Sequence, residues 1–303
     1  MSKGLTETVA QLFRPQKPLW ACEFTSRHIV VAGVDGGRRR VQAKSLTDLP
    51  YGLITASLGE KNIKDAEQVR SIVRQALRAA SFKGSEIVVV IPDESARIAF
   101  LTAETLPKTV TDQQTFLRWK LKKTVPFDVD SAQITFQVVG THANGGRKSQ
   151  SYDLLVTLSP RSIIEEYENL MDGLDIHAGF VVPSTLAALN LLPVTADDTL
   201  FVKVAPDCVT TTVFQNKQIR FYRRVADLGL YESVYPTLLY YQDKLGGSTL
   251  KQMVVCSDGI SHLAINDLQE RIGLTAVQFE PRNIDDVYKP ALGAVHLSWA
   301  NLI

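Results

Sequence analysis

The chain has 303 residues, of which 45% are apolar and 21% charged, so it can bury one large or two medium cores. Its 33 Lys and Arg residues against 32 Asp and Glu residues give a net charge of +1, which supplies no long-range field for nucleic acid or acidic lipid. The longest apolar run, residues 87–91, is too short to cross a bilayer, and the N-terminus does not resemble a secretory signal. We therefore expect a cytoplasmic protein.

The cysteines and histidines are not spaced like metal or redox sites. Cys22, Cys208 and Cys256 are far apart, each in an apolar, strand-like stretch, which predicts small buried residues in a reducing compartment. The histidines lack the i,i+4 or carboxylate spacing of metal ligands, so no metal is expected. They are His28, His142, His177, His262 and His296.

Residues 1–18 form an amphipathic segment, in which apolar side chains from Leu5 to Phe13 recur at helical spacing until Pro15. We expect it to pack against its own domain, because it is too short to anchor stably in a membrane. A βββαβ unit follows. Its pattern predicts strands around residue 21 and at 28–34, 41–46 and 86–91, with a helix at 65–80.

Residues 96–159 have the pattern of an inserted subdomain. We predict a strand at 96–106, a helix at 111–124, and a hairpin of strands 133–139 and 152–158 joined by Asn144-Gly145-Gly146. A helix at 161–172, a strand near Phe180 and a helix at 184–192 complete the first half.

The second half repeats the opening order. The pattern predicts strands at 200–205, 209–214, 220–225 and 253–257, with helices at 230–245 and 261–272. Two βββαβα units in one chain predict a duplicated α/β architecture. The expected boundaries are 1–18 for the N-terminal segment, 19–95 and 160–195 for the first domain, 96–159 for the insertion and 196–303 for the second domain.

A duplicated βββαβα unit resembles the actin-like, or ribonuclease H-like, architecture, in which two domains flank a cleft. A more specific likeness is local: one strand ends at Pro92, a second at Leu106-Pro107, and a helix at Val125-Pro126-Phe127 before a hairpin. This order resembles the PilM-type pilus assembly proteins, which are related to FtsA and carry a subdomain at this place. The cytoplasmic domain of GspL-type secretion proteins is similar too.

The resemblance implies that ATP would lie between the domains on two Asp-x-Gly loops, whose carboxylates hold Mg²⁺ and whose glycines admit phosphate. The first loop falls on Glu23-Phe24-Thr25-Ser26, where Thr25 replaces the glycine. The second falls on Lys203-Val204-Ala205-Pro206-Asp207, where Lys203 replaces the acid and Pro206 removes an N–H donor. The adenosine loop becomes Ser257-Asp258-Gly259.

These substitutions predict that nucleotide chemistry is lost. An ammonium at Lys203 would repel Mg²⁺, so we expect no catalytic residue, no cofactor and a pseudo-ATPase. The alternative is a working actin-like ATPase that binds ATP with Mg²⁺. Its cofactor-binding residues would be Glu23, Thr25, Ser26, Lys203, Asp207, Ser257, Asp258 and Gly259.

The insertion has more apolar side chains than a helix and a hairpin alone are expected to bury, which predicts a partner-binding surface. Its predicted residues are Leu117, Leu121, Val125 and Phe127. The basic run at 118–123 is expected to form a solvated helix face.

The resemblance implies a cytoplasmic scaffold of the type IV pilus assembly platform, peripheral to the inner membrane. The expected partner is the N-terminal cytoplasmic tail of a PilN-like membrane protein, with pilus motor ATPases as further partners. We expect no nucleic acid, and membrane contact only through partners. A GspL-like component of type II secretion is an alternative.

Overall fold

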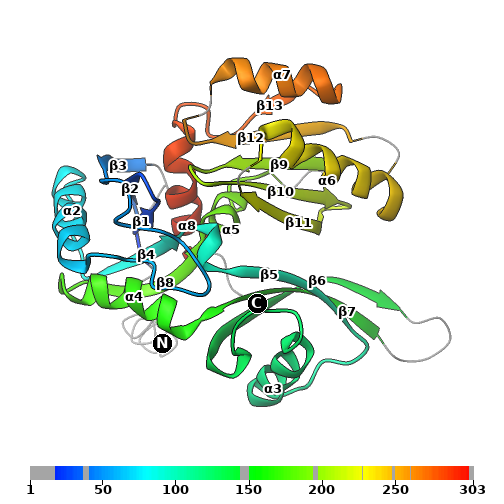
Figure 1. Ribbon diagram of the computed structural model, residues 1–303, viewed down its shortest axis with the longest axis horizontal. Coiled ribbons are helices and arrows are strands. Elements are labelled where there is room, and N and C mark those ends of the chain that lie inside the picture. The colour runs from blue at the N-terminus through cyan, green and yellow to red at the C-terminus, as the bar shows by residue number, and fades with distance from the viewer. Residues whose placement is uncertain are drawn as a thin grey trace, which may run out of the picture.

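The computed structural model describes residues 18–36, 41–143, 150–193, 197–226, 228–247, 250–259 and 261–299. These residues form two five-stranded sheets and a smaller three-stranded sheet (Figure 1). The predicted N-terminal amphipathic segment, up to residue 17, and the Asn144-Gly145-Gly146 turn lie outside the described residues. In the described part of the chain, no helix is both long and apolar enough to span a bilayer.

The first sheet joins three antiparallel strands to two parallel ones, in the order β3-β2-β1-β4-β8. Its strands are β1 (Trp20–Phe24), β2 (His28–Val34), β3 (Val41–Asp48), β4 (Glu86–Ile91) and β8 (His177–Pro183). The apolar run of β4 is buried on both of its faces, because helices cover both sides of the sheet.

Four helices pack on this sheet, two on each face. They are α2 (Ala66–Ala79) and α4 (Arg161–Asp172) on one face, and α5 (Ser184–Leu189) and α8 (Lys289–Trp299) on the other. α2 begins at Asp65, whose side chain accepts a 3.0 Å hydrogen bond from the backbone N–H of Gln68. α5 and α8 touch closely because Gly293 has no Cβ; an added one would overlap the carbonyl oxygen of Ala187.

The second sheet repeats this topology, in the order β11-β10-β9-β12-β13, and so confirms the predicted duplication. Its strands are β9 (Thr199–Val204), β10 (Cys208–Gln215), β11 (Gln218–Ala226), β12 (Gln252–Ser257) and β13 (Ala276–Gln278). Helices α6 (Leu230–Lys244) and α7 (His262–Ile272) cover one face, with Val234, Tyr241 and Leu268 in the core. The pattern did not predict β13, because three residues show too little periodicity.

The C-terminal helix α8 returns to the first sheet. Although the sequence boundaries group residues 196–303, α8 packs Leu292 and Val295 into the core of the first sheet. The short helix α5 lies between the two sheets: Ala187 belongs to the first core, and Ala188 contacts the second. By packing, α8 is therefore part of the first domain, and together with α5 it joins the domains.

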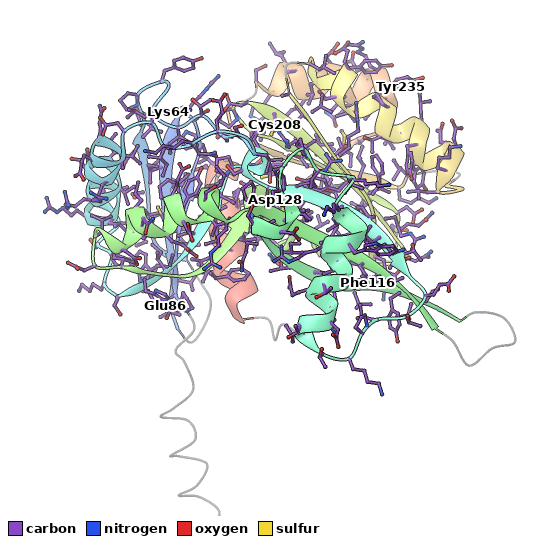
Figure 2. The ribbon with its side chains drawn as sticks, turned by 60° about the horizontal axis from the view of Figure 1, so that its bottom comes forward. Lys64, Glu86, Phe116, Asp128, Cys208 and Tyr235 are labelled. Atoms are coloured by element: carbon purple, nitrogen blue, oxygen red, sulfur yellow. The ribbon has the colours of Figure 1, made fainter. Side chains whose placement is uncertain are left out.

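The inserted subdomain is a three-stranded sheet covered by one helix. It comprises β5 (Arg97–Ala103), α3 (Val110–Leu121), β6 (Ala132–Ala143) and β7 (Gln150–Pro160), in the sheet order β5-β7-β6. The hydroxyl of Ser159 donates a 2.7 Å hydrogen bond to the carbonyl oxygen of Ser95, so the insertion leaves and rejoins the first domain at one place. Figure 2 shows Phe116 marking α3, well away from Tyr235 on α6.

All three cysteines are buried within the two large sheets, as predicted, and each is a free thiol. Burial raises the pKa of each thiol well above its usual range. They therefore stay neutral and behave as small apolar residues.

Candidate functional site

The polar residues of the interdomain cleft lie where strands of the two sheets end. Glu23 is near the end of β1, Asp93 follows β4, and Lys203 is near the end of β9. β1 and β4 run parallel, so their carboxyl ends meet at the same edge of the first sheet. The topology therefore places the carboxylates of Glu23 and Asp93 in the first domain near the ammonium of Lys203 in the second.

These three charges are almost completely buried. The Nζ atom of Lys203 lies 3.9 Å from Oδ2 of Asp93, and the two side chains are only 6% and 0% exposed. Asp93 also accepts hydrogen bonds from Thr185, at 2.8 Å from its N–H and 2.5 Å from its hydroxyl. The hydroxyl of Ser184 donates to Glu23. Each charge thus has a polar partner, as burial requires.

Burial and neighbouring charges shift the pKa values of Glu23 and Lys203 in opposite directions. Burial raises the pKa of Glu23 to about 7, although Lys203 and Ser184 pull it down. For Lys203, burial lowers the pKa, but the carboxylates of Asp93 and Glu23 outweigh it and raise the pKa above its usual value. Lys203 therefore stays charged, whereas Glu23 changes charge near neutral pH.

The space between these residues is very small. A cavity of about 20 Å³ is lined by Glu23, Ser26, Asp93, Lys203 and Asp207, among others. That volume holds roughly one water molecule. Pockets for ligands the size of a nucleotide have volumes of roughly 300–1,000 Å³. The cleft is therefore closed where phosphates would have to enter.

The first predicted loop forms a side-chain-stabilised turn. The hydroxyl of Thr25 accepts hydrogen bonds from the backbone N–H groups of Arg27, at 3.2 Å, and His28, at 2.9 Å. The same hydroxyl donates to the carbonyl oxygen of His28 at 2.9 Å. Thr25 thus closes the turn from β1 to β2, and it also lines the small cavity.

Three backbone donors of the other two predicted loops are already engaged. The N–H of Ala205 bonds the carbonyl oxygen of Cys208 at 2.9 Å, and the N–H of Asp258 bonds that of Val204 at 2.9 Å. The N–H of Ser257 bonds Oδ2 of Asp286 at 2.8 Å, and Pro206 has no N–H. Asp207 is exposed. The residues present do not fit Mg-ATP, because the cavity between them holds only about one water molecule and these three backbone donors are already used.

The predicted nucleotide residues border two cavities. Glu23, Thr25, Ser26, Lys203 and Asp207 line the small cavity, whereas Ser257 and Gly259 line another cavity of about 470 Å³. Buried Lys289 borders this second cavity and forms a 2.7 Å ion pair with Asp286. Since Asp286 also holds Ser257, this pair ties the start of α8 to the end of β12. Within the described ranges, no cluster of three or more His, Cys, Asp or Glu side chains is arranged to hold a metal ion.

Sequence reasoning missed the buried acceptor Asp93 and its partners. Asp93 comes directly after an apolar strand and Pro92, a position that could have marked it. Its hydroxyl partners Thr185 and Thr210 are 92 and 117 residues away in the chain, and no local pattern connects them to it.

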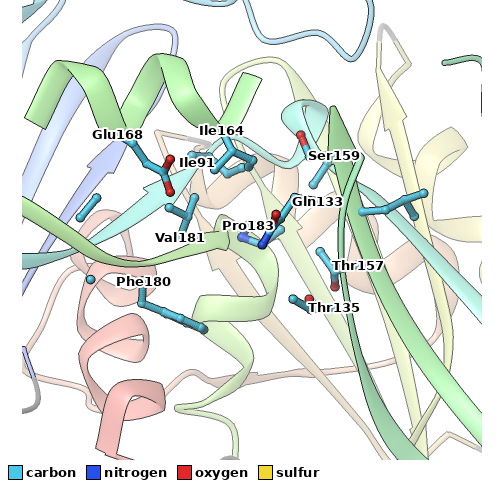
Figure 3. A pocket seen from close by; sticks show the side chains of 14 residues that line it. Ile91, Gln133, Thr135, Thr157, Ser159, Ile164, Glu168, Phe180, Val181 and Pro183 are labelled. Atoms are coloured by element: carbon cyan, nitrogen blue, oxygen red, sulfur yellow. The ribbon is translucent and has the colours of Figure 1, made fainter. Parts of the chain in front are cut away.

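A groove lies between the first domain and the insertion. Its volume is about 250 Å³, and Figure 3 shows α4 and β8 on one side and the β6–β7 hairpin on the other. Apolar side chains, including Ile164, Phe180 and Val181, alternate there with the polar groups of Gln133 and Glu168. The groove therefore offers both apolar pockets and hydrogen-bonding groups.

One wall of this groove is the edge of a sheet. Among the described residues, β8 pairs only with β4, so its other edge has no strand partner. The consecutive residues 178–181 of β8 all line the groove, whereas on β6 only Gln133 and Thr135 do so. Because side chains alternate along a strand, the groove runs along the edge of β8 and faces one side of the hairpin.

The predicted partner-binding residues lie elsewhere. Leu117 and Leu121 are fully buried in the core of the insertion, and Val125 and Phe127 pack against that core. The expectation of an apolar surface there was wrong for the two leucines, because β5 completes a three-stranded sheet that α3 can cover. The groove that the insertion makes with the first domain is on the opposite face of β6, since Gln133 and Thr135 line it and their neighbours Ala132 and Ile134 lie in the core.

The duplicated sheets, the joining helices and the cleft between them define an actin-like fold, as predicted, and solved structures agree. One chain of the PilM–PilN type IV pilus biogenesis complex is similar over 94% of this chain and 99% of its own, with a TM-score of 0.76 and 11% identity. The ethanolamine utilization protein EutJ from Carboxydothermus hydrogenoformans covers 95% and 93%, with a TM-score of 0.52 and 11% identity.

A protein of actin-like ATPase fold and unknown function from Bacteroides thetaiotaomicron also matches, over 89% of this chain and 93% of its own, with a TM-score of 0.52 and 8% identity. No family model matches the sequence, and no curated protein is similar to it. At these identities the structural matches establish the fold, and function has to be argued from the site.

Proposed function

We propose that this protein is a non-catalytic scaffold that binds an extended peptide in the groove between β8 and the β6–β7 hairpin. The observation that carries the proposal is the free edge of β8 along that groove. A peptide strand that pairs with such an edge gains backbone hydrogen bonds, while its side chains enter pockets on alternate sides.

The peptide we propose is the N-terminal cytoplasmic tail of a PilN-like membrane protein. Support comes from the similarity to a chain of the PilM–PilN complex and from the apolar lining of the groove. Two leucine side chains buried against Ile164 and Phe180 would contribute roughly 1.5–3 kcal/mol each, less the cost of ordering the peptide. An affinity of about micromolar, roughly 8 kcal/mol, is expected only if backbone pairing along the edge of β8 adds to this burial. The protein would then act in the cytoplasm, at the inner membrane, where it would also contact pilus motor ATPases.

The absence of ATPase activity is the second part of the proposal. It is supported by the closed cavity, the charge of Lys203 and the engaged backbone donors of the loops. A scaffold of this kind needs only a rigid first domain and insertion to hold the peptide.

The groove is tested by titrating a labelled PilN-like N-terminal peptide against the intact protein and against Thr135→Trp. Thr135 is exposed and lines the groove, so a tryptophan there should fill it and weaken binding at least about tenfold. The matched control is Thr111→Trp, at an exposed position on α3, which should bind as the unmodified protein does. Equal affinity of all three proteins would show that the groove is not the peptide-binding site. If none of them bound the peptide, the proposed scaffold function would be wrong.

A further inference from the structure

The buried ammonium of Lys203 belongs to one domain, and its anionic neighbours belong to the other. Lys203 extends from β9 in the second sheet. Glu23 lies on β1 of the first sheet, and Asp93 comes shortly after β4 of the same sheet. Oδ2 of Asp93 lies 3.9 Å from the ammonium and also accepts a 3.4 Å hydrogen bond from Thr210 on β10. Two groups of the second domain thus converge on one carboxylate of the first.

The oxygen atoms around this ammonium resemble the surroundings of a bound cation. Asp93 is held by Thr185, and one oxygen of Glu23 accepts a hydrogen bond from Ser184. The other oxygen of Glu23, Oε2, is buried and has no hydrogen-bond partner among the described residues. Glu23 and Lys203 both line the small cavity of the cleft. Carboxylate and hydroxyl oxygens are the ligands that hard divalent cations prefer.

We propose that Lys203 is a built-in counter-cation, which occupies the oxygen-lined site of the cleft and holds the two domains closed. The inference concerns the cleft and does not depend on the peptide groove. This role explains why the site does not suit Mg-ATP, because the ammonium of Lys203 already occupies the place of the metal ion. It also means that the two domains stay closed without a bound ligand. Without the ammonium, Asp93 and Glu23 would lose the positive charge that acts on both of them, and the cleft would open, take up a proton or recruit a cation.

The test uses Mn²⁺ alone as the probe, followed by its paramagnetic resonance signal and by calorimetry. Full-length Lys203→Ala should bind Mn²⁺ at least about tenfold more tightly than the unmodified protein. Adding Glu23→Gln and Asp93→Asn to this variant should abolish the gain. Lys44→Ala is the matched control, because Lys44 also reaches across to the second half, at 3.3 Å from Asp285, but on the exposed surface. An equal gain in Lys44→Ala, or none in folded Lys203→Ala, would overturn the proposal.

A second comparison decides the case if Lys203→Ala does not fold. The proposal expects Lys203→Met to be destabilised by two unpaired carboxylates, and the charge-free combination with Glu23→Gln and Asp93→Asn to recover most of the lost stability. If the triple variant is as unstable as Lys203→Met, Lys203 acts through packing, and its role as a counter-cation is wrong.

Discussion

His28 on β2 and Asp258 after β12 meet across the cleft, with Nε2 of the histidine 3.0 Å from Oδ2 of the aspartate. Both side chains are mostly buried, and the contact is an ion pair when His28 is protonated, although its geometry is not that of a hydrogen bond. Asp258 is itself held by the second sheet, through its N–H and the carbonyl oxygen of Val204. The pair therefore joins the first domain to the second.

We expect His28→Gln and Asp258→Asn each to lower the free energy of unfolding by roughly 1 kcal/mol, because each removes one half of a partly buried pair. The double variant should lose less than the sum of the two. Urea denaturation of the four proteins measures this coupling. The exposed Lys44–Asp285 pair provides the control cycle, for which a coupling near zero is expected. Additive losses for His28 and Asp258 would show that the contact does not stabilise the closed cleft.

Mg-ATP should show no saturable binding below millimolar concentration, because the cavity at Lys203 holds only about one water molecule. Direct binding of labelled ATP measures this, and a micromolar dissociation constant, about 8 kcal/mol of binding free energy, would contradict it.

Lys203→Asp alone should not produce ATP hydrolysis. The substitution removes the positive charge, but the N–H of Ala205 stays bonded to Cys208, and Pro206 still has none to offer. Phosphate release by the purified variant measures turnover, with the unmodified protein as the baseline. Turnover above that baseline would show that charge alone had blocked the chemistry.

The stability of the protein should depend on the ionisation of Glu23. Its pKa is about 7 in the folded protein against an ordinary value of 4.5, so the folded state binds more protons between these pH values. The free energy of unfolding should therefore fall as pH rises from 4.5 to 7, with Glu23 contributing about 3 kcal/mol to the decrease. Urea titrations at a series of pH values should show this decrease for the unmodified protein but not for Glu23→Gln. Parallel pH profiles of the two proteins would show that Glu23 does not cause it.

Core and groove residues of the insertion should respond differently to substitution. Leu117 is fully buried, so Leu117→Ala should destabilise the insertion by roughly 2–5 kcal/mol. Hydrogen exchange at β5 to β7 measures this loss. Peptide affinity should change only as far as the insertion unfolds, whereas Thr135→Trp should weaken binding without loss of protection. A folded Leu117→Ala protein with strongly reduced affinity would place the binding surface back on α3.

The elements that were predicted correctly have local causes. The apolar run of β4, the Asp65 cap of α2 and the apolar face of that helix depend on residues within a few positions of one another. The repeat of strand orders in the two halves follows from such local patterns. The prediction that Lys203 replaces an acid in the cleft comes instead from the resemblance to actin-like proteins. The sequence by itself thus determined most of the elements and the duplication.

Only the tertiary structure decided which distant residues meet. The return of α8 to the first sheet and the 3.9 Å approach of Lys203 to Asp93 depend on packing across more than 50 residues of chain. The burial of Leu117 depends on the assembly of α3 with all three strands of the insertion. No periodicity records such contacts, since each arises where complete sheets and helices fit together. For the same reason no local pattern predicts the groove along β8, which forms where the free edge of the first sheet faces the hairpin of the insertion.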